Sequence, residues 1–265
     1  MVRLLQVTDT HVVVPPKLVS GKLNTLGLLE AAVDRLLEDW ERLATVDALL
    51  VTGDIADDGD LESYRRFRVQ IERLNTPYLL IPGNHDRREP LRECFRDQAC
   101  VPREGKFNWV HDLSSLRVIG LDTVVADEGR GELDEQTLEF LSGTLSDEPE
   151  KPTLIAMHHP PFQSGIRFMD GIGLSGIAGL ERVLAPATND IRIVCGHVHN
   201  AITGSVGSRV ALSGLATCSV FAADYREDAP VGFLVKPGGY TVHDWDNGFR
   251  STSVTLDSSS GPYPF

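Results

Sequence analysis

Six of the eight histidines in this 265-residue sequence stand in five short polar clusters, together with aspartates and an asparagine. Carboxylates and imidazoles that pack together without a partner repel one another or lose solvation, and a bound cation removes that cost. Each cluster taken alone is typical of an ordinary turn or helix cap, whereas their joint occurrence predicts a metal centre. The clusters are Asp9-Thr10-His11, Gly53-Asp54, Gly83-Asn84-His85-Asp86, His158-His159-Pro160 and Gly196-His197-Val198-His199.

Each cluster directly follows a short apolar run of the kind that forms a buried strand. Strands whose ends converge on one edge of a sheet bring the residues just past them into one crevice. Amphipathic segments with helical spacing lie between several of the runs, so the sequence predicts an α/β fold of two stacked sheets flanked by helices. Strands with their clusters are expected at 3–11, 46–54, 77–86, 153–161 and 191–200, and helices at 25–43, 61–74, 133–145 and 177–185.

The chain divides by composition into three parts. We expect a core over residues 1–200 that carries all the metal-site motifs, and C-terminal strands over 201–250 that complete the second sheet. These extra strands predict an oligomer interface, and thus a homodimer or a higher homo-oligomer. Residues 251–265 are polar and rich in Pro, Gly and Ser, which predicts a tail that is mobile or drapes over a neighbour.

The net charge narrows the possible partners. Lys and Arg number 25 and Asp and Glu number 38, giving −13, which argues against a nucleic-acid polymer because such partners need basic tracks. No apolar run approaches the roughly 18 residues of a membrane span, and the N-terminus lacks a signal-peptide pattern, so a cytoplasmic protein is expected. The four cysteines form no CxxC pair and are expected as free thiols, with a Cys94–Cys100 bridge as the alternative.

The order of the five clusters resembles the calcineurin-like metallophosphoesterase family: D-x-H, G-D, G-N-H-D, a His-bearing strand end and G-H-x-H, between residues 9 and 199. The segments "HHPPF", "GIRFMDGIGL" and "CGHVHN" resemble the branch that includes class III cyclic nucleotide phosphodiesterases and bacterial glycerophosphodiesterases. The resemblance implies a four-layer αββα sandwich with extra C-terminal β segments. It also implies an enzyme that hydrolyses small phosphodiesters, either 3′,5′-cyclic nucleotides such as cAMP or glycerophosphodiesters, by attack of a metal-bridging hydroxide.

Two alternatives remain on the same scaffold. One is a broad-specificity phosphomonoesterase. The other is a non-catalytic metal-binding interaction module, which would predict missing ligands or a missing histidine in the G-N-H-D cluster, and all of these residues are present.

The resemblance also assigns the metal ligands. It implies one metal ion held by Asp9, His11 and His199, a second held by Asn84, His158 and His197, and Asp54 bridging the two. Mixed oxygen and nitrogen donors suit Mn, Fe, Co, Ni or Zn better than Ca, and the sequence does not choose among them. Two such ions roughly 3.5–4 Å apart can clamp an in-line phosphoryl displacement. No thiolate stands in any cluster, so a structural zinc is not expected.

The resemblance gives His85 a catalytic role, in which it donates a proton or hydrogen bond to the leaving-group oxygen or a phosphoryl oxygen. Asp86 would orient its ring. The alternative is that His85 only hydrogen-bonds a neighbouring loop. Asp57 and Asp58 are interpreted as leading into the next helix rather than as metal ligands.

Residues around the predicted ligands are expected to shape the pocket. His159 alternates away from His158 along the strand, which predicts a packing or supporting role. The Gly-rich segment 162–176 predicts a wall or lid of the substrate pocket, where the leaving group would contact Arg167, Phe168 and Asp170.

Overall fold

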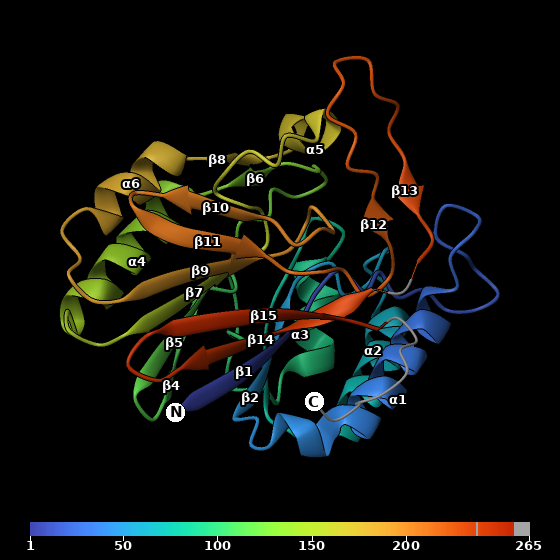
Figure 1. Ribbon diagram of the computed structural model, residues 1–265, viewed down its shortest axis with the longest axis horizontal. Coiled ribbons are helices and arrows are strands. Elements are labelled where there is room, and N and C mark those ends of the chain that lie inside the picture. Colours follow the sequence, from blue (N-terminus) through green and yellow to red (C-terminus); the bar gives the residue numbers. More distant parts are fainter. Residues whose placement is uncertain (237, 257–265) are drawn as a thin grey trace, which may run out of the picture.

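Two β-sheets pack face to face at the centre of the molecule, and helices cover their outer faces (Figure 1). The computed structural model describes residues 1–236 and 238–256. The first sheet has the order β15 (Phe249–Thr255), β14 (Gly239–Trp245), β1 (Val2–Val7), β2 (Ala48–Thr52) and β3 (Tyr78–Ile81). The second has the order β10 (Thr203–Val206), β11 (Arg209–Ser213), β9 (Ile191–Cys195), β7 (Thr153–Met157), β5 (Leu116–Leu121) and β4 (Trp109–Leu113).

The main helices form the two outer layers, which confirms the αββα sandwich predicted from the sequence. In Figure 1, α1 (Thr25–Leu43) and α2 (Leu61–Ile71) lie on the side of the first sheet, and α4 (Glu135–Asp147) and α6 (Ile177–Leu184) on the side of the second. A short 3₁₀ helix (Glu72–Leu74) extends α2, and α3 (Arg88–Phe95) follows β3. The Asn24 side chain caps α1 by accepting a hydrogen bond from the Gly27 amide.

The central strands are covered on both sides, which explains their continuous apolar runs. All residues of β2 and of β7 are buried. β1, β2 and β3 pair in parallel in the first sheet, as do β5, β7, β9 and β11 in the second. Parallel pairing places the carboxyl ends of these strands at the same edge of each sheet, and all the polar clusters follow such ends.

The C-terminal strands differ from the expectation that residues 201–250 complete the second sheet. β10 and β11 do extend that sheet, but β14 and β15 join the first sheet, where β14 pairs antiparallel with β1. β15 continues to Thr255, so residues 251–255 of the expected polar tail form an edge strand. The remainder of the predicted tail, 257–265, lies outside the described residues.

Smaller elements lie above the carboxyl ends of the strands. β12 (Val220–Phe221) and β13 (Phe233–Leu234) form a short hairpin, and its long loop projects from the body of the molecule (Figure 1). We call residues 220–234 the arm. β6 (Gly131–Glu132) pairs with β8 (Leu174–Ser175), and the short helix α5 (Arg167–Gly171) lies in the segment before β8.

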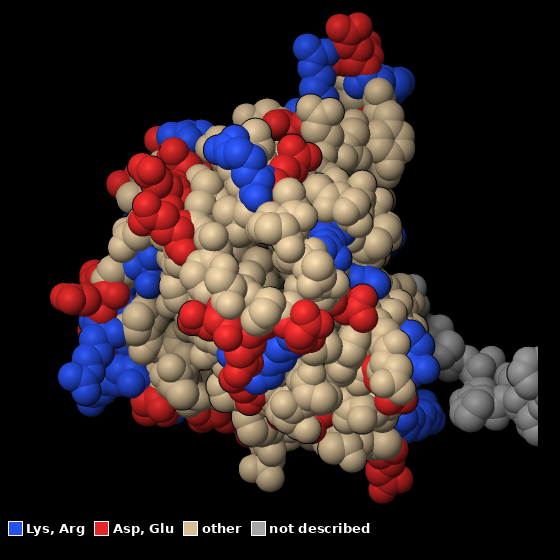
Figure 2. All heavy atoms as spheres, turned by 90° about the vertical axis from the view of Figure 1, so that its left-hand side faces the viewer, with Lys and Arg blue, Asp and Glu red and all other residues tan. Residues whose placement is uncertain are grey.

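Three general properties of the described residues bear on the expectations from the sequence. None of their helices is both long and apolar enough to cross a membrane. On the face shown in Figure 2, acidic and basic side chains are interspersed, and the part of the chain drawn there presents no continuous basic tract. All four cysteines are free, as predicted from their spacing.

Candidate metal centre

The predicted ligands meet in one crevice at the carboxyl ends of strands from both sheets. Asp9, His11, Asp54 and Asn84 follow β1, β2 and β3 of the first sheet, and the three other histidines follow β7 and β9 of the second. Asn84 is half-buried, and the remaining ligands are buried: Asp9, His11, Asp54, His158, His197 and His199. The sheet topology therefore confirms that the clusters converge.

One group of donor atoms comes from Asp9, His11, Asp54 and His199, and all four lie within 4.8 Å of one another. The Nε2 atoms of His11 and His199 are 3.1 Å apart. Asp54 Oδ2 is 3.3 Å from His11 Nε2, and Asp9 Oδ1 is 3.6 Å from His199 Nε2. Several lone pairs therefore face a common point.

A second group lies beside the first and shares Asp54 with it. Asn84 Oδ1 is 2.9 Å from His197 Nδ1 and 3.2 Å from His158 Nε2. His158 Nε2 is also 3.4 Å from Asp54 Oδ2. The same carboxylate oxygen is thus close to a donor atom of each group.

The donor atoms fit metal ions chemically and geometrically. Separations of about 3 Å are expected between two donor atoms that bind the same ion at roughly 2.0–2.2 Å. Imidazole nitrogens mixed with carboxylate and amide oxygens suit first-row transition metals. Each group combines both donor types, so each can hold one such ion.

The backbone at several predicted ligands has a conformation that residues other than glycine rarely adopt. Five predicted ligands have φ between 45° and 69°: Asp9, His11, Asp54, His197 and His199. Such conformations cost free energy and cluster at functional sites, where the surrounding structure enforces them. Two glycines of the motifs permit the close approach, because a Cβ at Gly53 or Gly83 would overlap His158 or Asp54.

The pKa shifts of the histidines within the crevice favour the binding of a cation. Burial lowers the pKa of His158, but the Asp54 carboxylate outweighs this effect and raises that pKa to about 9. Burial also lowers the pKa of His11, and the carboxylates of Asp54, Asp57 and Asp9 together raise it to about 8. Burial, reinforced by His158, lowers the pKa of His197 to about 3. Protons thus gather on the imidazoles nearest to the carboxylates, and a metal ion displaces such protons when it binds.

His85 lies at the edge of the crevice, with its side chain 40% exposed. Its Nδ1 is 3.0 Å from the carbonyl oxygen of Asp57 and 3.4 Å from the Asp57 carboxylate. The same carboxylate is 3.1 Å from His11 Nδ1. Asp57, which the sequence placed at the start of a helix, therefore contacts both a predicted ligand and the predicted catalytic histidine.

The structure does not place Asp86 against the ring of His85, which corrects the orienting role expected for it. Its buried carboxylate accepts hydrogen bonds from the backbone amides of Ile55, Ala56 and Gly83, at 3.1, 3.1 and 2.8 Å. Burial, with the nearby Asp54 charge, raises the pKa of Asp86 to about 6. Asp86 therefore ties the turn after β3 to the turn after β2. His85 and Asp86 are adjacent in the sequence, but the turn directs their side chains apart.

A cavity of about 230 Å³ adjoins the donor groups. Of the three residues predicted to contact the leaving group, Phe168 lines it. Arg167 instead donates a hydrogen bond to the Glu227 carbonyl, 2.8 Å away, and Asp170 accepts from the amide and hydroxyl of Ser164 at 2.7 and 2.8 Å. Those two predictions find no support in the geometry.

Other side chains complete the surroundings. His159 Nδ1 is 2.8 Å from Thr123 Oγ1, and its Nε2 is 3.2 Å from the Gly129 carbonyl, in line with a packing role. Cys218 lies with His11 and His199 in a group whose ligand atoms are within 4.8 Å of one another, and no sequence motif had indicated a thiol at this place. Phe221 and Phe233 of the arm also line the cavity, and they come from the part of the chain where no motif was recognised.

Comparisons with known proteins agree with this geometry. Residues 2–201 match the family described as calcineurin-like phosphoesterase. A probable glycerophosphodiester phosphodiesterase of Arcobacter nitrofigilis is 30% identical over 265 residues, covering 99% of this chain and 96% of that protein. A cAMP/cGMP dual specificity phosphodiesterase of Mycobacterium tuberculosis is 34% identical, covering 96% of this chain and 76% of that protein. The crystal structure of a dimetal phosphatase from Danio rerio has the same fold, with a TM-score of 0.65 at 14% identity, covering 97% of this chain and 99% of that one.

Proposed function

Because the chain belongs to the calcineurin-like phosphoesterase family, we propose that it is a binuclear metal-dependent phosphodiesterase. Its substrates would be small phosphodiesters, either 3′,5′-cyclic nucleotides or glycerophosphodiesters, as the names of two relatives suggest. The observation that carries the proposal is the pair of donor groups that share Asp54 Oδ2, at 3.3 Å from His11 and 3.4 Å from His158.

The two donor groups divide the metal-binding work. Asp9, His11 and His199 would hold one ion, and Asn84, His158 and His197 the other, with Asp54 between them. Bound Mn, Fe, Zn or Co ions would supply Lewis-acid catalysis and activate the attacking water. Asn84 adds an oxygen donor without adding negative charge, which keeps the site attractive to a phosphate anion.

His85 would donate a proton to the leaving group. Its Nδ1 faces the Asp57 carbonyl, so Nδ1 carries a proton and Nε2 is the nitrogen that can reach a substrate. When Nε2 also carries a proton, this histidine at the rim of the cavity can donate that proton to the departing alcohol oxygen and keep the one on Nδ1. Asp57 holds the ring in this orientation from both its backbone and its carboxylate.

The size of the cavity supports a small substrate. At about 230 Å³ it is smaller than the roughly 300–1,000 Å³ of pockets for drug-sized ligands. The net charge of −13 also disfavours a nucleic-acid polymer as substrate.

The test compares a model diester with a model monoester. The purified protein with added Mn²⁺ is assayed on bis(p-nitrophenyl) phosphate and on p-nitrophenyl phosphate. We expect a higher kcat/KM on the diester and loss of activity on chelation. A much higher kcat/KM on the monoester would favour the broad-specificity phosphomonoesterase instead, and metal binding without activity on either ester would favour a non-catalytic module.

A further inference from the structure

The lining of the cavity is of two kinds. One part is polar and contains five of the predicted metal ligands, together with His85, Asp57, Ser20, Cys218 and Ser219. The other part is apolar and is contributed by Val19, Leu23, Phe168, Met169, Ile172, Phe221 and Phe233. We call this second part the apolar wall. Its side chains offer no hydrogen-bonding group to a ligand.

Aromatic rings of the wall come from two separate elements and extend to the metal ligands. Phe221 of the arm lies with its ring centroid 4.6 Å from that of His199 and 6.4 Å from that of Phe168 on α5. Phe168 is 43% exposed, so part of its ring is open to a ligand. The rings thus form a partly open surface directly beside the donor groups.

Contacts between the arm and the α5 segment hold this surface together. Arg167 donates a hydrogen bond to the Glu227 carbonyl at 2.8 Å, and its guanidinium is 3.5 Å from the Glu227 carboxylate. The ring of Tyr225 packs over Gly165, where a Cβ would lie 3.2 Å from two ring carbons. The arm therefore places Phe221 and Phe233 opposite residues from α5 rather than leaving them in solvent.

We propose that the apolar wall selects the leaving group, and that it takes a flat aromatic group such as the base of a nucleotide. This inference rests on the proposed phosphodiesterase function and narrows its substrate to nucleoside phosphodiesters. A substrate with its phosphate at the metal centre extends along the rings of Phe168, Phe221 and Phe233. Stacking on such rings is tolerant of base identity, because every base has a π-face.

Other leaving groups fit the wall less well. The hydroxyls of glycerol would lose their hydrogen bonds to water and gain none from the wall. A quaternary ammonium can bind aromatic faces, but here it would lie beside two metal cations. The carboxylates that line the cavity, Asp54 and Asp57, are already close to histidines. An uncharged aromatic ring avoids both costs.

The experiment measures binding, independently of turnover, by calorimetry on the full-length protein loaded with Mn²⁺. The ligands are AMP, ribose 5-phosphate, phosphocholine and inorganic phosphate. We expect AMP to bind about tenfold or more tightly than ribose 5-phosphate, the gain expected from stacking of one base. Phe168→Ala and Phe233→Ala should remove most of this difference and leave phosphate affinity unchanged.

Leu234→Ala is the matched control. Leu234 neighbours Phe233 on the same strand, is 51% exposed and does not line the cavity, so its removal should change none of the affinities. Equal binding of AMP and ribose 5-phosphate would overturn the inference, as would an AMP preference that survives both phenylalanine substitutions. Tighter binding of phosphocholine would assign the wall to a quaternary ammonium instead. Absence of phosphate binding would overturn the proposed function itself.

Discussion

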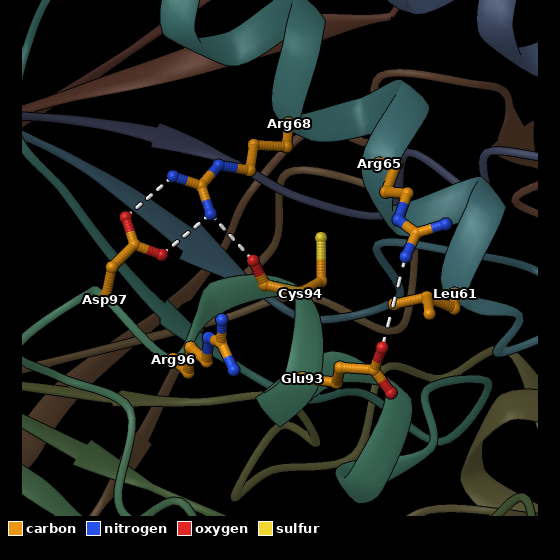
Figure 3. Close-up of a pocket in the computed structure, with 7 residues that line it drawn as sticks. All are labelled: Leu61, Arg65, Arg68, Glu93, Cys94, Arg96 and Asp97. Carbon is orange, nitrogen blue, oxygen red and sulfur yellow. Dashed lines mark hydrogen bonds and ion pairs between the residues drawn. The ribbon is translucent and has the colours of Figure 1, made fainter.

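Two hollows in the surface are lined by charged side chains, and they differ in how those charges are balanced. The hollow between α2 and α3, of about 480 Å³, contains Arg65, Arg68 and Arg96 (Figure 3). Arg68 donates two hydrogen bonds of 2.7 Å to Asp97, and Arg65 faces Glu93 at 3.9 Å. The smaller cavity at the metal centre instead crowds buried carboxylates and imidazoles around common points.

The difference shows which kind of charged lining indicates a site. In the arginine-lined hollow, opposite charges from the protein pair at the surface, where such pairs contribute little and require no ligand. Its thiol is not activated either, because burial raises the pKa of Cys94 to about 11. At the candidate metal centre, like donors face one another in a buried crevice, and a bound cation would offset the cost of this crowding. The balance of charge in the lining, rather than the volume of the hollow, therefore indicates which of the two hollows is a site.

The largest effect is expected from Asp54→Ala, because this side chain belongs to both donor groups. Metal content measured by elemental analysis should fall for both ions, and hydrolysis of bis(p-nitrophenyl) phosphate should drop by more than the roughly 10²-fold of a lost general acid. A variant that keeps two ions and full activity would remove the distinction between the two hollows.

His85→Ala should separate chemistry from metal binding within the same cavity. We expect a loss of roughly 10²-fold or more in kcat, the size typical of general acid catalysis, with metal content unchanged. Metal loss in this variant would mean that the ring supports the site structurally, as in the alternative of a hydrogen bond to a neighbouring loop.

Asp57→Asn should have a smaller effect, about 10- to 100-fold, as found for residues that orient metal ligands or catalytic groups. The double variant Asp57→Asn with His85→Ala shows whether Asp57 acts through His85 or through His11. If Asp57 acts through His85, the double variant should be no slower than His85→Ala alone. If the two losses multiply, Asp57 acts mainly through its 3.1 Å contact with His11.

Arg68→Ala should have the smallest effect and serves as the control from the other hollow. Activity should be unchanged, and the free energy of unfolding in urea should fall by about 1 kcal/mol or less. Hydrogen bonds from Arg68 hold the pKa of Asp97 below its usual 3.8. The difference in the free energy of unfolding between the variant and the wild type should therefore be largest above that pH and should shrink as the pH falls below it. A loss of activity would make this hollow functional.

The fold and the convergence of the polar clusters could be predicted from the sequence because both depend on local patterns. A strand that ends in a polar cluster is visible in a few residues, and the parallel order places those ends together. Pairing of β14 with β1 joins residues more than 230 positions apart and leaves no local pattern, so its sheet was assigned wrongly. Turn geometry has the same effect on a smaller scale, since Asp57, three residues past Asp54, reaches His85 whereas the adjacent Asp86 does not.

The division of the ligands between the two sheets has a consequence for stability. Each donor group takes side chains from both layers: Asp9 and His11 join His199 across the interface, and Asn84 joins His158 and His197. Bound ions would therefore fasten one half of the sandwich to the other. By mass action, an ion present at 100 times its dissociation constant stabilises the folded state by about 2.7 kcal/mol. The melting temperature should then report occupancy of the site, so that a chelated sample loses rigidity together with its chemistry.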